Sequence, residues 1–306
     1  MQNLSKFIIR PSRNLYSLNR DLGPENFILK GQVFTRRDFD LPNTRGLVLK
    51  CSWFLPKFSK NTLPCIVYCH GNCGSRLDSL EIAYRLLESD ISLFTFDFAG
   101  SGLSEGSYVS LGYYESWDLK SVMDYIKESG LASAIGLWGR SMGATSSILY
   151  GSCDPTLAVL ILDSPFLSLK QVVDDYLGKY NFIPKKLLGF FWDKIKNHIR
   201  KKANFDISEV NPAKFISQCE MPAIFMHGID DKLVSISHGR MLYELYRGEK
   251  YLLELGGGHN STRAQKVIDR VIEILVQTFS SPQLPQEILE ESIKTRRASN
   301  IIFFRK

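Results

Sequence analysis

Ser141 stands at the centre of residues 139–143, Gly-Arg-Ser-Met-Gly, which form a G-x-S-x-G pattern. An apolar run over 134–138 precedes the pattern and small residues at 144–147 follow it, as a strand, a tight turn and a helix require. A serine hydroxyl on such a turn can attack an acyl carbon, and the next N–H, on Met142, then points at the developing oxyanion. Because the pattern arises by chance in roughly one chain in ten of this length, Ser141 needs partners elsewhere in the chain.

A serine hydroxyl is a weak nucleophile, so it needs a neighbouring base, and the base needs a carboxylate that orients it. In a strand–turn–helix setting the three groups follow the chain order serine, acid, histidine. Of the five histidines, His259 is the one that follows the last predicted strand, in the glycine-rich run 256–260. We therefore predict that His259 is the base; the other four are His70, His198, His227 and His238.

The acid is expected after the penultimate predicted strand, where the run 227–234, HGIDDKLV, offers Asp230 and Asp231. The residues alone leave both open, because an aspartate in a tight loop commonly caps a turn. Asp163, at the end of the strand that follows the serine helix, is a rival. Its more ordinary role is that of a structural carboxylate that accepts hydrogen bonds from loop amides.

A second donor to the oxyanion is expected from the loop after the third predicted strand. His70, Gly71 and Asn72 occupy this loop. The Asn72 N–H and the Met142 N–H would then both donate hydrogen bonds to the oxyanion. We expect His70 to brace the loop rather than to take part in chemistry.

These residues must be positioned by a sheet whose strands end close together. Residues 31–41 and 46–55 read as two antiparallel strands joined by a turn at 42–45. Short apolar runs then alternate with helical segments; they lie at 63–69, 91–96, 134–138, 157–162, 222–226 and 251–255. This alternation predicts an α/β fold with a mostly parallel central sheet and helices on both faces. In such sheets the loops at the carboxyl ends of the strands carry the site.

The segment between residues 163 and 221 interrupts the alternation, since a single helix would be enough to join the strands on either side. We predict a helical lid at about 164–220, with helices near 168–180 and 185–202. The domain division is then a 1–30 N-terminal extension, a 31–280 α/β domain that contains the lid, and a 281–306 C-terminal tail.

Residues 184–203 of the predicted lid combine an apolar stripe with a strongly basic composition. Leu187, Leu188, Phe191, Ile195 and Ile199 recur at helical spacing. Seven basic residues oppose the single acid Asp193; they are Lys185, Lys186, Lys194, Lys196, Arg200, Lys201 and Lys202. The simpler interpretation is a lid helix that packs its stripe on the domain with its lysines in water. The alternative is that the lid also makes peripheral contact with an anionic membrane.

The bulk composition narrows the class of protein. The chain has 306 residues, a net charge of +6 and six cysteines without a close-spaced framework. No apolar run approaches the ~20 residues that span a bilayer, and no signal peptide precedes the domain. We expect a cytoplasmic protein with no bound metal, no cofactor and no nucleic-acid partner. Gly100 and Gly102 lack the remainder of a dinucleotide fingerprint.

Six segments taken together resemble a known family: HGNCGSR, FDFAGSGLSEG, GLWGRSMGA, LDSPF, HGIDDKLV and GGGHN. They are similar to those of serine-aminopeptidase-like α/β hydrolases, and most similar to a plant and protist branch that begins with a comparable F-I-I-R-P…Y segment. The resemblance covers about residues 7–280. It implies the α/β-hydrolase fold, Ser141 as nucleophile, Asp231 as acid in the H-G-x-x-D position and His259 as base. It also implies that the Asn72 and Met142 amides form the oxyanion hole.

The function that we expect is a serine hydrolase that cleaves an acyl ester or thioester through an acyl-enzyme. One alternative is a serine aminopeptidase-like peptidase, and another is a ligand-binding protein that keeps the fold without catalysis. An aminopeptidase must hold a free ammonium with a carboxylate, for which the lid offers Asp174 and Asp175 as the nearest pair. Aromatic residues that suit an acyl chain are abundant there: Tyr176, Phe190, Phe191 and Trp192.

Overall fold

The computed structural model describes residues 8–58, 61–178 and 185–280, with backbone alone at 177, 185–188, 190 and 191. In these ranges one sheet has the strand order β1-β2-β3-β5-β4-β6-β7-β8-β9. The strands are β1 Asn26–Leu29, β2 Gln32–Pro42, β3 Val48–Pro56, β4 Leu63–Cys69, β5 Ser92–Phe96, β6 Ala132–Arg140, β7 Val159–Asp163, β8 Ala223–Gly228 and β9 Lys250–Leu255.

The sheet is antiparallel at its start and parallel through the half that carries the candidate site. β1, β2 and β3 pair antiparallel, and β3 joins β5 in the same way. From β5 through β4, β6, β7 and β8 to β9, every pairing is parallel. The register sets Cys69 opposite Gly139 and Arg140 opposite Asp163. The carboxyl ends of β4, β6 and β7 therefore meet at one edge, and the predicted mostly parallel α/β sheet is confirmed.

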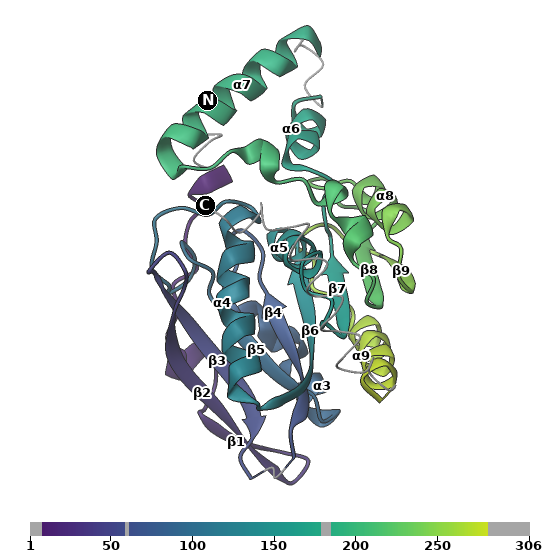
Figure 1. Ribbon diagram of the computed structural model, residues 1–306. Helices are drawn as coiled ribbons and strands as arrows, with labels where there is room; N and C mark the ends of the chain where they lie inside the picture. The colour runs from purple at the N-terminus through teal and green to yellow at the C-terminus, as the bar shows by residue number, and fades with distance from the viewer. Residues whose placement is uncertain (1–7, 59–60, 179–184, 281–306) are drawn as a thin grey trace.

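Helices cover both faces of this sheet (Figure 1). α4 Tyr113–Ser129 and α5 Met142–Gly151 pack on one face, and α3 Leu80–Glu88 and α9 Gln265–Ser280 pack on the other. Within β5, Phe94 joins the first core and Leu93 joins the second. Because side chains alternate along a strand, a strand covered on both faces is buried at every position, as all five residues of β5 are.

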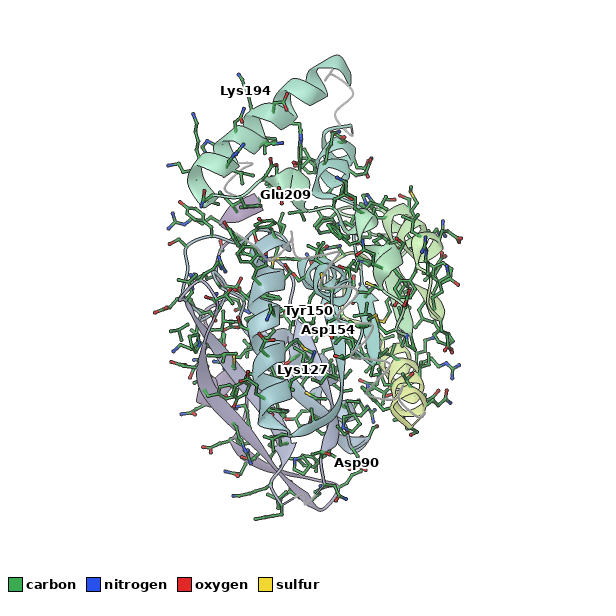
Figure 2. The ribbon with its side chains drawn as sticks, in the orientation of Figure 1. Asp90, Lys127, Tyr150, Asp154, Lys194 and Glu209 are labelled. Atoms are coloured by element: carbon green, nitrogen blue, oxygen red, sulfur yellow. The ribbon has the colours of Figure 1, made fainter. Side chains whose placement is uncertain are left out.

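The remaining described helices are shorter or lie outside these two layers. They are α2 Leu18–Asp21, α6 Leu169–Gly178, α7 Lys185–Ala203 and α8 Ile236–Leu245, with 3₁₀ turns at Arg76–Ser79, Ile207–Glu209, Pro212–Lys214 and Ile216–Gln218. A buried carboxylate ties the lower part of α4 to α5 (Figure 2). Asp154 accepts hydrogen bonds from Lys127 Nζ at 2.6 Å and from the Tyr150 hydroxyl at 2.5 Å.

Residues 8–29 pack into the body of the molecule. Ile8 and Ile9 are 5% and 3% exposed, Arg13 donates to the Ser104 carbonyl at 2.5 Å, and the Tyr16 hydroxyl donates to Asp97 at 2.6 Å. β1 also lies before residue 31, where the sequence analysis began the hydrolase-type domain. A four-residue edge strand is too short for its alternation to be recognised in the sequence.

The helices α6 and α7 stand off the end of the sheet near α5 (Figure 1). α7 buries Trp192, Ile195 and Ile199, which are 6%, 2% and 0% exposed. Its C-terminal end is held on α4, because the Tyr114 hydroxyl donates to the Asn204 carbonyl at 2.7 Å. Among the described residues, no helix is long and apolar enough to cross a membrane.

Candidate active site

The turn between β6 and α5 presents Ser141. Its backbone has φ 53° and ψ −110°, a conformation that a non-glycine residue adopts only under strain. The glycines on either side permit the close approach of other backbone. A Cβ on Gly143 would lie 1.9 Å from the Cys69 carbonyl oxygen, and one on Gly139 would lie 2.4 Å from the Gly143 carbonyl oxygen. The glycines of the G-x-S-x-G pattern are therefore required by packing, and they let the elbow close against β4.

Ser141, His259 and Asp231 form one chain of hydrogen bonds. The Ser141 hydroxyl lies 2.9 Å from His259 Nε2, and His259 Nδ1 lies 2.6 Å from Asp231 Oδ2. The His259 side chain is 9% exposed and that of Asp231 is 0% exposed. In this arrangement Nδ1–H donates to the carboxylate and Nε2 is free to accept the serine proton, which is the geometry that general-base activation requires.

The loop after β8 fixes the Asp231 carboxylate. Its Oδ1 accepts the backbone N–H of Leu233 at 2.9 Å and that of Val234 at 2.8 Å. His227 Nε2 donates to the Val234 carbonyl at 2.9 Å and lies 3.4 Å from Asp231 Oδ2. Burial would raise the pKa of the Asp231 carboxyl, but hydrogen bonds from His227 and His259 outweigh it and hold this pKa well below its usual range. The carboxylate is therefore ionised at neutral pH.

The loop after β4 reaches the same point. The Cβ position of Gly71 lies 3.9 Å from the Ser141 Cβ, so Asn72, the next residue, lies close to the elbow. His70 Nδ1–H donates to the Gly71 carbonyl at 2.7 Å, and His70 Nε2 accepts the Phe98 N–H at 3.0 Å. The expected bracing role of His70 is confirmed by these two contacts. Met142 is the first residue of α5, so its N–H has no partner within the helix.

The rival carboxylates lie elsewhere. Asp163, at the end of β7, accepts two hydrogen bonds from the Arg263 guanidinium, at 2.5 and 2.9 Å, and one from the Ser164 hydroxyl at 3.0 Å. Asp230 is exposed and accepts the Gly257 N–H at 3.3 Å. Neither carboxylate has a hydrogen bond to His259 among the contacts of the described residues.

The two carboxylates of α6, Asp174 and Asp175, face other side chains. Asp174 pairs with Lys170 one turn earlier on α6. Asp175 accepts His238 Nε2 at 2.7 Å and the Gln171 side-chain amide at 2.8 Å. On α7, Trp192 is buried and Tyr176 on α6 is 40% exposed, whereas the side chains of Phe190 and Phe191 lie outside the described set.

Two arginines that no sequence motif pointed to lie beside Ser141 and His259. Arg140 is the variable residue before Ser141, and its Nη2 donates to the carbonyls of His259 at 3.1 Å and Ser261 at 2.7 Å. Arg263 follows His259 by four residues and is 5% exposed. A charged residue inside or next to a motif carries meaning only when its burial is known, so the sequence alone held no usable signal. Within the described ranges, no three metal-ligating side chains converge.

With this geometry in place, comparison with known proteins identifies the family. Residues 60–214, about half of the chain, match the family described as "Serine aminopeptidase, S33". A Bacillus subtilis relative, the uncharacterized protein YqkD, is 30% identical over 226 residues, which are 71% of this chain and 71% of the relative. The chain belongs to the serine aminopeptidase S33 family.

Other relatives of this S33 protein carry the name of a lipase. Lysophosphatidylserine lipase ABHD12 of Danio rerio is 28% identical over 65% of the chain. The chain spans 51% of that relative's length. The Rattus norvegicus protein of the same name is 29% identical over 75% of the chain and 56% of its own length.

Solved structures agree on the fold. The Pyrococcus furiosus esterase Pf2001 has a TM-score of 0.65 at 19% identity, over 88% of this chain and 99% of its own. Est1E from Butyrivibrio proteoclasticus, solved with ferulic acid, has a TM-score of 0.60 at 17% identity, over 79% of this chain and 99% of its own. The S33 protein thus has the α/β-hydrolase fold. Family, relatives and fold together make it an enzyme of the serine hydrolase class.

Proposed function

We propose that this S33 protein cleaves an acyl ester or thioester through a covalent acyl-enzyme formed on Ser141. The observation that carries the proposal is the unbroken hydrogen-bonded chain from Ser141 through His259 to Asp231. In the first step His259 Nε2 takes the hydroxyl proton while the serine oxygen bonds to the acyl carbon. His259 then gives that proton to the departing alcohol or thiol, and water hydrolyses the acyl-enzyme by the same route.

The remaining catalytic roles follow from position. Asp231 holds His259 in the Nδ1–H tautomer and stabilises the imidazolium that forms during each step. The N–H groups of Asn72 and Met142 would hold the oxyanion, one from the loop after β4 and one from the start of α5. These assignments rest on the closeness of Gly71 to Ser141 and on the open first turn of α5.

An ester or thioester is favoured over a peptide by the lid carboxylates. An aminopeptidase needs a free carboxylate for the substrate ammonium, but Asp175 is engaged by His238 and Gln171 and Asp174 by Lys170. The named lipase relatives point to an acyl ester as well. Against this stands the family's own name, so the peptidase is the second candidate.

The setting of the reaction is part of the same proposal. The lid would comprise about residues 164–220 of a 31–280 hydrolase-type domain, between a 1–30 extension and a 281–306 tail. The protein would work in the cytoplasm, peripherally on anionic membranes through the basic side chains of α7. We also propose that it is allied to the plant and protist branch that its F-I-I-R-P segment resembles.

The test compares a thioester with an amide. A medium-chain alkyl thioester and an alanine or proline anilide are assayed with wild-type protein and with Ser141→Ala as the blank. We expect kcat/KM for the thioester to exceed that for either anilide by at least ~100-fold, the scale of a few kcal/mol in the transition state. Faster turnover of either anilide would replace the proposal with the peptidase.

A further inference from the structure

We propose that Arg140 and Arg263 are positioning residues that fasten the loop carrying His259 to the nucleophile elbow. This inference rests on the proposed function, because it assigns a task to groups that touch the backbone around the base and not the substrate. It concerns residues 256–264, which join β9 to α9 and contain neither helix nor strand.

Backbone N–H groups reach the loop carbonyls of Gly257 and Gly258, but two further loop carbonyls accept from an arginine side chain. Residues outside helices and strands cannot satisfy their backbone carbonyls through a ladder, so each buried carbonyl needs another donor. Arg140 Nη2 supplies that donor to two of them, at 3.1 Å to the His259 carbonyl and at 2.7 Å to the Ser261 carbonyl. Because Arg140 adjoins Ser141 in the chain, one side chain spans from the nucleophile to the backbone of the base.

Arg263 holds the other side of the same loop. Its Nη1 lies 3.4 Å from the Gly258 carbonyl, and its Nη2 donates to the Ser164 hydroxyl at 2.9 Å. Two further contacts, at 2.5 and 2.9 Å, form a bidentate pair with Asp163, and both side chains are 3% exposed. A buried bidentate pair is geometrically restrictive, so it fixes the loop relative to the end of β7.

Two carboxylates complete the cluster and balance its charge. Glu81 of α3 accepts the Arg263 backbone N–H at 2.6 Å and lies 3.6 Å from Arg140 Nη1, while Asp163 lies 3.8 Å from Arg140 Nε. Two guanidinium groups therefore face two carboxylates. The arginines come from β6 and from the loop itself, and the carboxylates come from α3 and β7. We call Arg140, Arg263, Asp163 and Glu81 the loop clamp.

The loop clamp lies beside the triad but makes none of its contacts. Its effect is to set where the His259 backbone sits, and through it the 2.9 Å separation of Nε2 from the Ser141 hydroxyl. Misplacement of a reacting group by about 1 Å can cost on the order of 100-fold in rate. The loss of the clamp should therefore fall on kcat and leave substrate binding largely unchanged.

The experiment uses the full chain with Arg140→Met and Arg140→Lys, and Arg240→Met as the matched control. Arg240 of α8 forms an exposed bidentate pair with Glu254 of β9, and among the described contacts its side chain makes no hydrogen bond to residues 256–264. The readouts are kcat and KM for a short-chain ester, the rate of fluorophosphonate labelling, and the melting temperature. We expect Arg140→Met to lower kcat and the labelling rate by ~10- to 100-fold with KM near the wild-type value. Arg140→Lys should retain part of the rate, and Arg240→Met should retain all of it.

The outcomes separate this inference from the proposed function. If Arg140→Met or Arg140→Lys keeps the wild-type kcat, or changes KM alone, the clamp does not position the base. If Arg140→Met fails to fold, Arg140→Lys decides the matter, because it keeps the charge but a single ammonium cannot replace all three guanidinium nitrogens, which lie near the two carbonyls, Glu81 and Asp163. Labelling that persists in Ser141→Ala would instead overturn the proposed function, whatever the arginine variants do.

Discussion

Asp231 and Asp163 are buried carboxylates near the ends of adjacent strands, and they differ in their hydrogen-bond partners. β7 and β8 are neighbours; Asp163 is the last residue of β7, and Asp231 lies in the loop after β8. Asp231 accepts two backbone N–H groups on one oxygen and offers the other to His259. Asp163 gives both oxygens to Arg263. The described hydrogen bonds of the Asp163 side-chain oxygens are with Arg263 and Ser164 and not with an imidazole, as expected of a structural carboxylate.

This contrast leads to a prediction on the acid. We expect Asp231→Asn to lower kcat by up to ~10⁴-fold, because an amide NH2 donates a hydrogen bond to Nδ1 instead of accepting one and so favours the wrong imidazole tautomer. Asp230→Asn, one residue earlier and exposed, is the matched control and should change kcat little. Steady-state kinetics on both folded variants check this prediction. A larger loss of kcat in Asp230→Asn than in Asp231→Asn would assign the role of the acid to Asp230.

At the scale of elements, the pattern of apolar residues was enough to predict most strands and helices. β4 occupies the predicted residues 63–69, and the strands predicted at 31–41 and 46–55 pair antiparallel as expected. These segments carry long alternating or continuous apolar runs, which depend only on local burial. β1 and the docking of residues 8–22 depend on contacts such as Tyr16 with Asp97, whose partners are far apart in the chain.

The candidate site was likewise foreseen only where chain order and motif constrain it. Ser141 and His259 follow from the elbow and from position after the last strand. The choice of Asp231 over Asp230 needed a family resemblance. The loop clamp could be recognised only in the three-dimensional structure, because arginines such as Arg140 and Arg263 usually lie at the surface. Pairings between loops are set by the closure of the sheet, which no local pattern encodes.

The basic residues of helix α7 differ in their surroundings, which the composition did not reveal. Lys196 forms an ion pair with Asp206 at 2.9 Å, so an acid beyond the helix joins Asp193 in opposing its charge. Lys194, Lys201 and Lys202 are exposed, and Lys194 lies on the side of α7 away from the body (Figure 2). The buried Trp192, Ile195 and Ile199 occupy the inner side. An exposed basic face over a packed apolar stripe suits contact with anionic headgroups without unfolding of the lid.

We therefore predict that Lys201→Glu with Lys202→Glu weakens binding to phosphatidylserine vesicles, since each exposed lysine near such a surface contributes ~1 kcal/mol. Lys30→Glu with Lys266→Glu, an equal change in charge on other exposed elements, should bind like the wild type. Vesicle sedimentation checks this, and binding should also fall with added salt as the Debye length shortens. Equal loss in both double variants, or no binding at low salt, would leave α7 as a lid alone.

At the scale of the whole molecule, the parallel sheet gathers the site from distant segments. Ser141 and His259 are 118 residues apart, and His259 and Asp231 are 28 apart, yet one line of hydrogen bonds joins them. The register of β4, β6, β7 and β8 brings their carboxyl ends to a single edge. The loop clamp then ties α3, a helix on the face opposite α5, to that edge.

The most direct test of the account is covalent labelling of the folded protein with a fluorophosphonate, which reports an activated serine without knowledge of the substrate. We predict a single adduct on Ser141 by mass spectrometry, absent in Ser141→Ala and slowed in His259→Ala. Circular dichroism of each variant would verify that it is folded. An adduct that persists in folded Ser141→Ala, or a wild-type protein that takes none, would contradict the assignment of Ser141 as the nucleophile.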